Sequence, residues 1–168
     1  MYKGNITEVP LLDLKAQYQP LKKELDEALI KTAESQYFIL GKEVETLEKN
    51  LADYLEVKHA IGVSSGTDAL LIALMAIDLK PGDKIIMPTY SFFATAGVVA
   101  RMNASSVFTE IESNTFNMKT DDLEKYYSKD VKAIMPVHLF GQSAEMEPIL
   151  EFAKAHNIYV IEDCAQAI

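Results

Sequence analysis

The sequence predicts an α/β fold: a mostly parallel sheet of about five strands with helices on both faces, preceded by two N-terminal helices. Two observations support this. In the second part of the chain, short runs recur that are apolar throughout, as in strands buried on both faces of a parallel sheet. Helical segments separate most of these runs, which is typical of strand–helix–strand units. We expect residues 1–58 to form a helical segment and residues 59–168 to belong to the α/β domain.

The two N-terminal helices are predicted from helical spacing of apolar residues. Pro20 can occupy the first turn of a helix that runs to about Ser35. Its predicted buried stripe consists of Leu21, Leu25, Ala28, Leu29 and Thr32. Gly41 interrupts the chain, and the stripe of the second helix consists of Val44, Leu47, Leu51, Tyr54 and Leu55. Each helix is expected to bury one face.

The α/β part is expected to begin near His59. Its predicted strands are residues 60–63, 84–88, 106–111, 132–137 and 158–163. Its predicted helices are residues 67–78, 91–102 and 146–156, with a shorter one at 121–127. Asn157 is the predicted C-cap of the helix at 146–156.

Composition excludes several classes of protein. The 168 residues suffice for one domain with a core, and acidic residues outnumber basic ones 25 to 16. Arg101 is the only arginine, so a nucleic-acid surface or docking on an anionic membrane is not expected. Cys164 is the only cysteine, which excludes an internal disulfide and Cys₂ or Cys₄ zinc sites, and we predict no metal.

No targeting or membrane segment is evident in the sequence. The N-terminus lacks the apolar core of a signal peptide, and no apolar run approaches the roughly 20 residues of a membrane span. A cytoplasmic protein is the expectation.

Ligands bind at the carboxyl ends of strands in open parallel sheets, so the residues that follow the strands are the candidate site. In VSSGTDAL (63–70), Gly66 permits close approach of a ligand, and Thr67 and Asp68 begin a helix whose free N–H groups favour a phosphate. An ordinary N-cap turn explains the same residues. The stretch is neither a GxGxxG nor a Walker motif.

Two further stretches carry candidates with open alternatives. In PTYSFFATA (88–96), Phe92 or Phe93 can stack on a flat heterocycle, or both can pack in the core. In PVHLFGQ (136–142), His138 can bond a ligand or be a polar strand end.

The last stretch, VIEDCAQAI (160–168), places Glu162 and Asp163 on opposite faces of a strand end. A buried carboxylate needs a cationic partner or several donors, and no basic residue of the chain is placed to pair with it. The alternative is a capping Asp, and Cys164 is expected to be small buried filler. A phosphate at 64–68, a flat ring at Phe92 and a ring nitrogen at Asp163 together describe pyridoxal phosphate (PLP).

The ordered set SSGTDAL, PTYSFFATA, PVHLFGQ and IEDCAQAI resembles the DegT/StrS group of sugar aminotransferases, which are fold-type I PLP enzymes. VPLLDLKAQY (9–18) and YFILGKEVETLE (37–48) are similar to the N-terminal segment of that group. The resemblance implies that residues 59–168 are a truncated PLP-binding large domain. It also implies a homodimer that transfers an amino group, from glutamate, to a nucleotide-linked keto-sugar.

The resemblance also assigns residues. It implies that the amides of Gly66, Thr67 and Asp68, with the Thr67 hydroxyl, hold the PLP phosphate. Phe92 matches the aromatic that stacks on the pyridine ring. Asp163 matches the carboxylate on the ring nitrogen, and Gln166 matches a glutamine near the ring hydroxyl.

No catalytic residue is assigned within the chain, because the group's Schiff-base lysine lies beyond Ile168. Lysines such as Lys42, Lys84 and Lys132 match no lysine position of the group. The rest of the large domain and the small domain are likewise expected outside the chain, so residues 1–168 alone are expected to be inactive. Three alternatives stay open: a sugar dehydratase with histidine in place of that lysine, a non-catalytic binding or regulatory protein on this fold, and an unrelated nucleotide-binding α/β domain.

Overall fold

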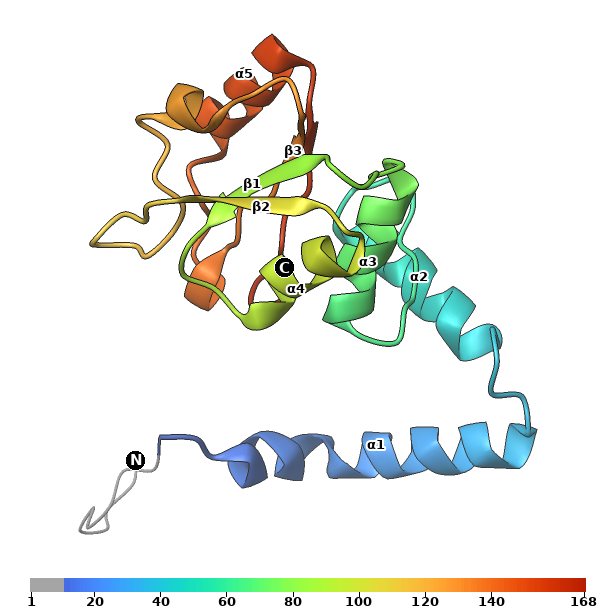
Figure 1. Cartoon of the computed structure of the whole chain (residues 1–168). Coiled ribbons are helices and arrows are strands. Elements are labelled where there is room, and N and C mark those ends of the chain that lie inside the picture. The colour runs from blue at the N-terminus through green and yellow to red at the C-terminus, as the bar shows by residue number, and fades with distance from the viewer. Residues whose placement is uncertain (1–10) are drawn as a thin grey trace, which may run out of the picture. The chain divides into compact units, whose positions relative to one another are not determined.

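The computed structural model describes residues 11–168, which divide into two compact units between Gly62 and Val63. The first unit holds helices α1 (Leu14–Ser35) and α2 (Lys42–Tyr54). The second holds four strands, three α-helices and two 3₁₀ turns (Figure 1). Within residues 11–168, no helix is long and apolar enough to cross a membrane.

Helix α1 begins earlier than its sequence predicted. The Asp13 carboxylate accepts a hydrogen bond from the Ala16 N–H at 3.0 Å and caps the helix, so Pro20 lies inside the helix rather than in its first turn. Neither α1 nor α2 contains a buried residue, and the predicted buried stripes are wrong for the described chain. Leu25 and Leu29, for example, stay exposed.

The sheet has four strands rather than about five. The predicted strand at residues 60–63 does not form, because its backbone pairs with no strand among the described residues. The Gly62 N–H instead donates to the Glu48 carboxylate at 2.7 Å.

The four strands are all parallel, in the order β2-β1-β3-β4. They are β1 (Lys84–Pro88), β2 (Ser105–Thr109), β3 (Val131–Ile134) and β4 (Tyr159–Val160). Strand β2 pairs on one side of β1, and the next strand in the sequence, β3, pairs on its other side. The strand order therefore reverses between β1 and β3. Such a switch point is where open α/β sheets bind ligands, at the carboxyl ends of the strands.

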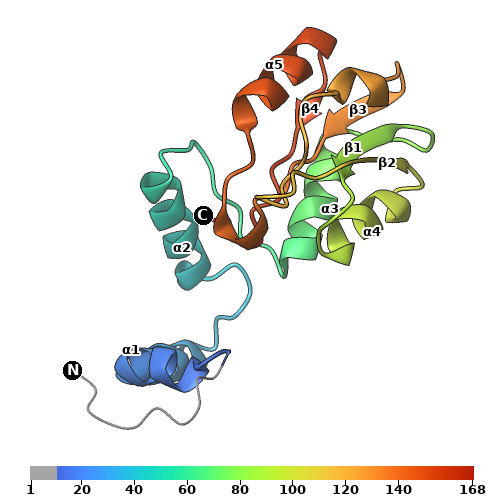
Figure 2. The same ribbon diagram turned by 90° about the vertical axis from the view of Figure 1, so that its left-hand side faces the viewer.

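Helices cover both faces of the sheet, as predicted. Helices α3 (Gly66–Ala76) and α4 (Phe93–Arg101) pack on the face that carries Ile85 and Met87. Helix α5 (Met146–His156) packs on the opposite face against Ile86 and Ile134 (Figure 2). Successive residues of a strand point to opposite faces, so an apolar run such as KIIMP supplies both cores.

The remaining elements are short. Residues 121–127, predicted as a helix, contain the 3₁₀ turn η1 (Leu123–Tyr126), and η2 (Leu139–Gly141) follows the end of β3. Asn157 adopts the left-handed conformation after α5, with φ of 54°, which confirms the predicted C-cap.

Candidate cofactor site

The amino end of α3 forms the first part of the site. Ser65 is the N-cap, and its hydroxyl accepts a hydrogen bond from the Asp68 N–H at 3.1 Å. Within residues 11–168, the N–H groups of Gly66 and Thr67 have no acceptor. A Cβ added at Gly66 would meet nothing within 4 Å, so the space beside the Gly66 backbone is open. Two of the three predicted phosphate-binding amides are therefore available, and the third is engaged by Ser65.

Asp68 also brings a negative charge to this turn. Its carboxylate accepts hydrogen bonds from the hydroxyls of Ser64 and Ser65, and these bonds hold the pKa of the carboxyl below its usual value of 3.8. The carboxylate is thereby held against the two serines.

Thr67 and Phe92 line one hollow of about 500 Å³, together with Gly97 and Arg101. Phe92 is the N-cap residue of α4, and 74% of its surface is exposed. An exposed ring beside the α3 terminus is free to stack on a flat ligand, whereas a core ring is not. Phe93, the other aromatic candidate, is also exposed and lines the same hollow.

Asp163 is the buried carboxylate of the site, with 5% of its surface exposed. Its Oδ2 accepts a hydrogen bond from Thr95 Oγ1 at 2.8 Å, and its Oδ1 accepts one from the Ala165 N–H at 3.2 Å. Among residues 11–168 it forms no ion pair. A buried anion held only by neutral donors suits a protonated heterocycle.

Backbone pairing fixes Asp163 at the end of the sheet. It forms a parallel bridge with Val137, its N–H donates to Pro136 O at 2.9 Å, and its carbonyl accepts from the His138 N–H at 3.1 Å. Thr95, in the first turn of α4, then joins Asp163 to the helix that Phe92 begins.

Gln166 lies apart from these contacts. Its Oε1 accepts a hydrogen bond from the Phe140 N–H at 2.6 Å, which ties the chain end to η2. Phe140 has φ of 55°, a left-handed conformation that is uncommon for a bulky residue. In the described part of the chain, no hydrogen bond joins the Gln166 side chain to Asp163 or Phe92.

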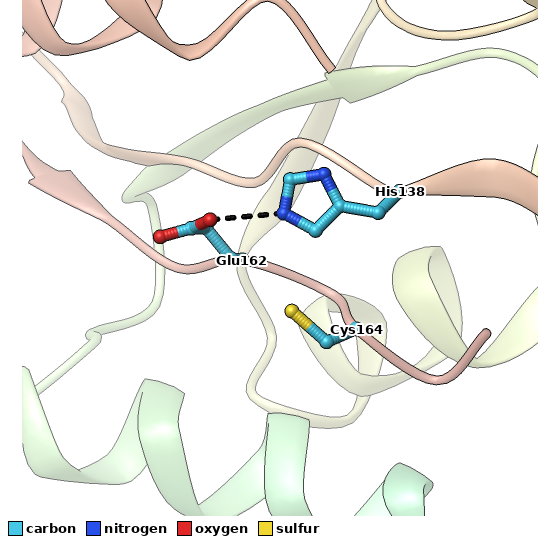
Figure 3. Close-up of side chains that lie close together, drawn as sticks. All are labelled: His138, Glu162 and Cys164. Carbon is cyan, nitrogen blue, oxygen red and sulfur yellow. Dashed lines mark hydrogen bonds and ion pairs between the residues drawn. The ribbon is translucent and has the colours of Figure 1, made fainter. Parts of the chain in front are cut away.

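His138, Glu162 and Cys164 form a neighbouring cluster, with potential ligand atoms within 4.8 Å of one another (Figure 3). His138 is buried, and its Nδ1 accepts from the Ala144 N–H at 3.0 Å. In the neutral ring the proton is therefore on Nε2, which donates to Glu162 Oε2 at 2.9 Å. A protonated Nε2 is not a metal ligand, so this cluster suits an ion poorly.

The structure corrects the expectation for Cys164 and shows the partners of the His138 ring. Cys164 is exposed rather than buried filler. Partial desolvation of its sulfur, together with the charges of Glu162 and Asp163, raises the pKa of the thiol. His138 is a polar strand-end residue whose two ring nitrogens both have partners. The spacing of residues in the sequence does not predict the hydrogen bond from the Ala144 N–H to His138, because that contact depends on the loop after η2.

Known proteins of similar sequence cover this whole region. The chain is 48% identical to a pleiotropic regulatory protein of Geobacillus stearothermophilus, over 95% of this chain and 43% of that protein. It is 41% identical to UDP-N-acetyl-3-dehydro-alpha-D-glucosamine 3-aminotransferase of Acidithiobacillus ferrooxidans, over 96% of this chain and 44% of that protein. The chain thus spans less than half the length of these relatives.

Solved structures agree. NtdA of Bacillus subtilis with bound cofactor PMP superimposes with a TM-score of 0.94 at 34% identity, over 99% of this chain and 38% of that one. DesV of Streptomyces venezuelae gives a TM-score of 0.91 at 38% identity, over 95% of this chain and 43% of that one. Because residues 19–168 also match the family model, the chain belongs to the DegT/DnrJ/EryC1/StrS aminotransferase family, as its sequence predicted.

Proposed function

We propose that the full-length protein is a PLP-dependent aminotransferase that moves an amino group from glutamate to a nucleotide-linked keto-sugar. Family membership and the PMP-bound neighbour support the cofactor. Relatives named as transaminases of UDP- and dTDP-linked sugars support the substrate class. The observation that carries the proposal is the buried Asp163 carboxylate, which has no cationic partner within residues 11–168.

The residues of the chain fit PLP. Gly66 and Thr67 would bind the phosphate through their free amides, and Phe92 would stack on the ring. Asp163 would hold a proton on the ring nitrogen through a charge-assisted hydrogen bond. When bound, PLP supplies a protonated ring that accepts electrons from the substrate. Asp68, whose amide is engaged, would act through its place in the turn, and Gln166 is proposed near the ring hydroxyl.

Cofactor binding tests the site directly. In the full-length protein, Asp163→Asn is expected to weaken PLP binding by about 10- to 100-fold, because a neutral amide replaces a charged acceptor. Asp121→Asn is the matched control, because Asp121 is an exposed surface residue that pairs with Lys119. The dissociation constant is measured by titrating the absorbance of bound PLP. Equal affinity of both variants and the parent would contradict the assignment of Asp163.

Amino transfer is tested separately, by the release of 2-oxoglutarate from glutamate in the presence of UDP-, dTDP- or GDP-linked keto-sugars. The prediction that residues 1–168 alone are inactive is checked in the same assay. A cytoplasmic location also stays a prediction, as does the division into a helical segment (1–58) and a PLP-binding part (59–168).

The homodimer is proposed from exposed apolar surface in the first unit. The exposed side chains include Leu29, Phe38, Ile39 and Leu40. Surfaces of this kind mark protein contacts. Sedimentation of the full-length protein as a monomer at micromolar concentration would contradict a dimer.

A regulatory role is a second candidate, favoured by the name of the relative that is 48% identical. A full-length protein that binds PLP but releases no 2-oxoglutarate would favour this role. A dehydratase is the third candidate, since a structure named as GDP-4-keto-6-deoxymannose-3-dehydratase superimposes with a TM-score of 0.77 at 28% identity. Loss of a sugar hydroxyl without net amino transfer would identify it.

A further inference from the structure

Two adjacent carboxylates follow β4, and the structure holds each in a different way. Asp163 is buried against Thr95, whereas the Glu162 side chain is 48% exposed and faces His138 (Figure 3). A charge-assisted hydrogen bond from Asp163 to a ligand depends steeply on distance and angle. The orientation of the backbone at 162–163 therefore matters for binding.

His138 contacts this segment in two ways. Its backbone N–H donates to Asp163 O at 3.1 Å, and its Nε2–H donates to Glu162 Oε2 at 2.9 Å. The Ala144 N–H at 3.0 Å from Nδ1 fixes the ring in the Nε2–H tautomer, because Nδ1 must accept. The ring thus connects the loop after η2 to the end of β4 and has no free donor or acceptor nitrogen.

We propose that His138 is a positioning residue for Asp163: its ring holds Glu162 and thereby sets the orientation of the carboxylate that follows. His138 itself does not touch the ligand in this arrangement. The inference rests on the proposed PLP site. It goes beyond that site because it assigns the buried imidazole and the exposed Glu162 to cofactor affinity.

The tautomer is tested first, without cofactor. Long-range ¹H–¹⁵N spectra of the imidazoles in the full-length apoprotein are expected to show His138 neutral, protonated on Nε2 and unprotonated on Nδ1. A ring protonated on Nδ1, or an equal mixture of the two tautomers, would overturn the proposal, because the bond to Glu162 would then be absent or intermittent.

Matched variants test the positioning. His138→Gln keeps a donor at the reach of Nε2 and is expected to bind PLP within about 3-fold of the parent. His138→Asn keeps an acceptor near Nδ1 but has no donor that reaches Glu162, so PLP binding is expected to weaken by about 10-fold. Glu162→Ala is expected to weaken PLP binding by about 10-fold, as His138→Asn does. Glu162→Gln keeps an acceptor for His138 and serves as its control.

The double variant His138→Asn/Glu162→Ala decides between positioning and independent effects. If both residues act through one hydrogen bond, the double variant binds PLP no more weakly than the single variant that has the lower affinity. Losses that multiply to about 100-fold, or single variants that bind like the parent, would overturn the proposal. If the parent itself binds no PLP, the proposed function fails instead, so the two failures are distinguishable.

Discussion

The hydroxyl of Thr95 is the group whose removal should most directly disturb Asp163. Thr95 is buried, and its one hydroxyl proton is donated to Asp163 Oδ2 at 2.8 Å. Its oxygen must therefore accept from Ser91 Oγ, which lies 3.0 Å away. Ser91, Thr95 and Asp163 form a chain of hydrogen bonds in which each bond polarises the next.

Thr95→Val preserves the shape of the side chain and removes the hydroxyl. A hydrogen bond to a charged group contributes about 1.5–3 kcal/mol, and valine cannot supply it. We expect the free energy of unfolding of the full-length apoprotein to fall by about 2 kcal/mol. The measurement is urea denaturation followed by circular dichroism, with an unchanged dependence on denaturant.

Two controls make the test specific. Thr95→Ser keeps the hydroxyl and should lose only the contribution of one methyl group, about 0.8 kcal/mol. Ser91→Ala removes the outer, partly exposed bond and should cost about 0.5–1 kcal/mol. A loss below about 0.5 kcal/mol for Thr95→Val, or an equal loss for Ser91→Ala, would refute the reasoning.

Two further predictions concern the loops around the site. Asn117 donates to Gln142 O at 3.0 Å and to Ser143 O at 3.1 Å, and accepts from the Leu139 N–H at 3.1 Å. Asn117→Ala is therefore expected to lower the free energy of unfolding by about 3 kcal/mol and to speed hydrogen exchange at the Leu139 amide; unchanged exchange would contradict it. Because hydrogen bonds from Ser64 and Ser65 lower the pKa of Asp68, its contribution to stability is present above pH 3.8 and is lost as the pH falls through the lowered value. Ser64→Ala should raise that pKa toward 3.8 in an NMR titration, and an unmoved pKa would show that Ser64 is not the cause.

Periodicity predicted the elements that carry the cores. The strand at 84–88 and the helix at 146–156 formed with the predicted bounds, because both bury apolar side chains at the spacing of their element. The run at 60–63 is also apolar but pairs with no strand in the described chain. A short apolar run does not itself indicate whether a neighbouring strand exists. The start of α1 was predicted too late, because Pro20 was placed in the first turn although Asp13 caps the helix.

The sequence predicted the features of the candidate site that depend only on the carboxyl ends of parallel strands meeting at one edge of the sheet. Asp163 lies at the end of the sheet, as expected, and Phe92 and Thr67 line one hollow. The hydrogen bonds of Thr95 with Asp163 and of His138 with Glu162 were not predictable, because they join residues that are 68 and 24 positions apart in the sequence. The engagement of the Asp68 amide by Ser65 also required the geometry of the turn.

The all-parallel sheet has a consequence for how the protein is made. Neighbouring parallel strands cannot be joined by a hairpin, so each pairing must wait for a long connection to be completed. The contact between Thr95 and Asp163 closes 68 residues of chain and is available only after β3 and β4 have been synthesised. Formation of contacts this distant in sequence is slow. A growing chain on the ribosome therefore acquires the α3 turn early and the buried carboxylate of Asp163 late, so the proposed contact of Asp163 with a ring nitrogen can form only after the sheet has assembled.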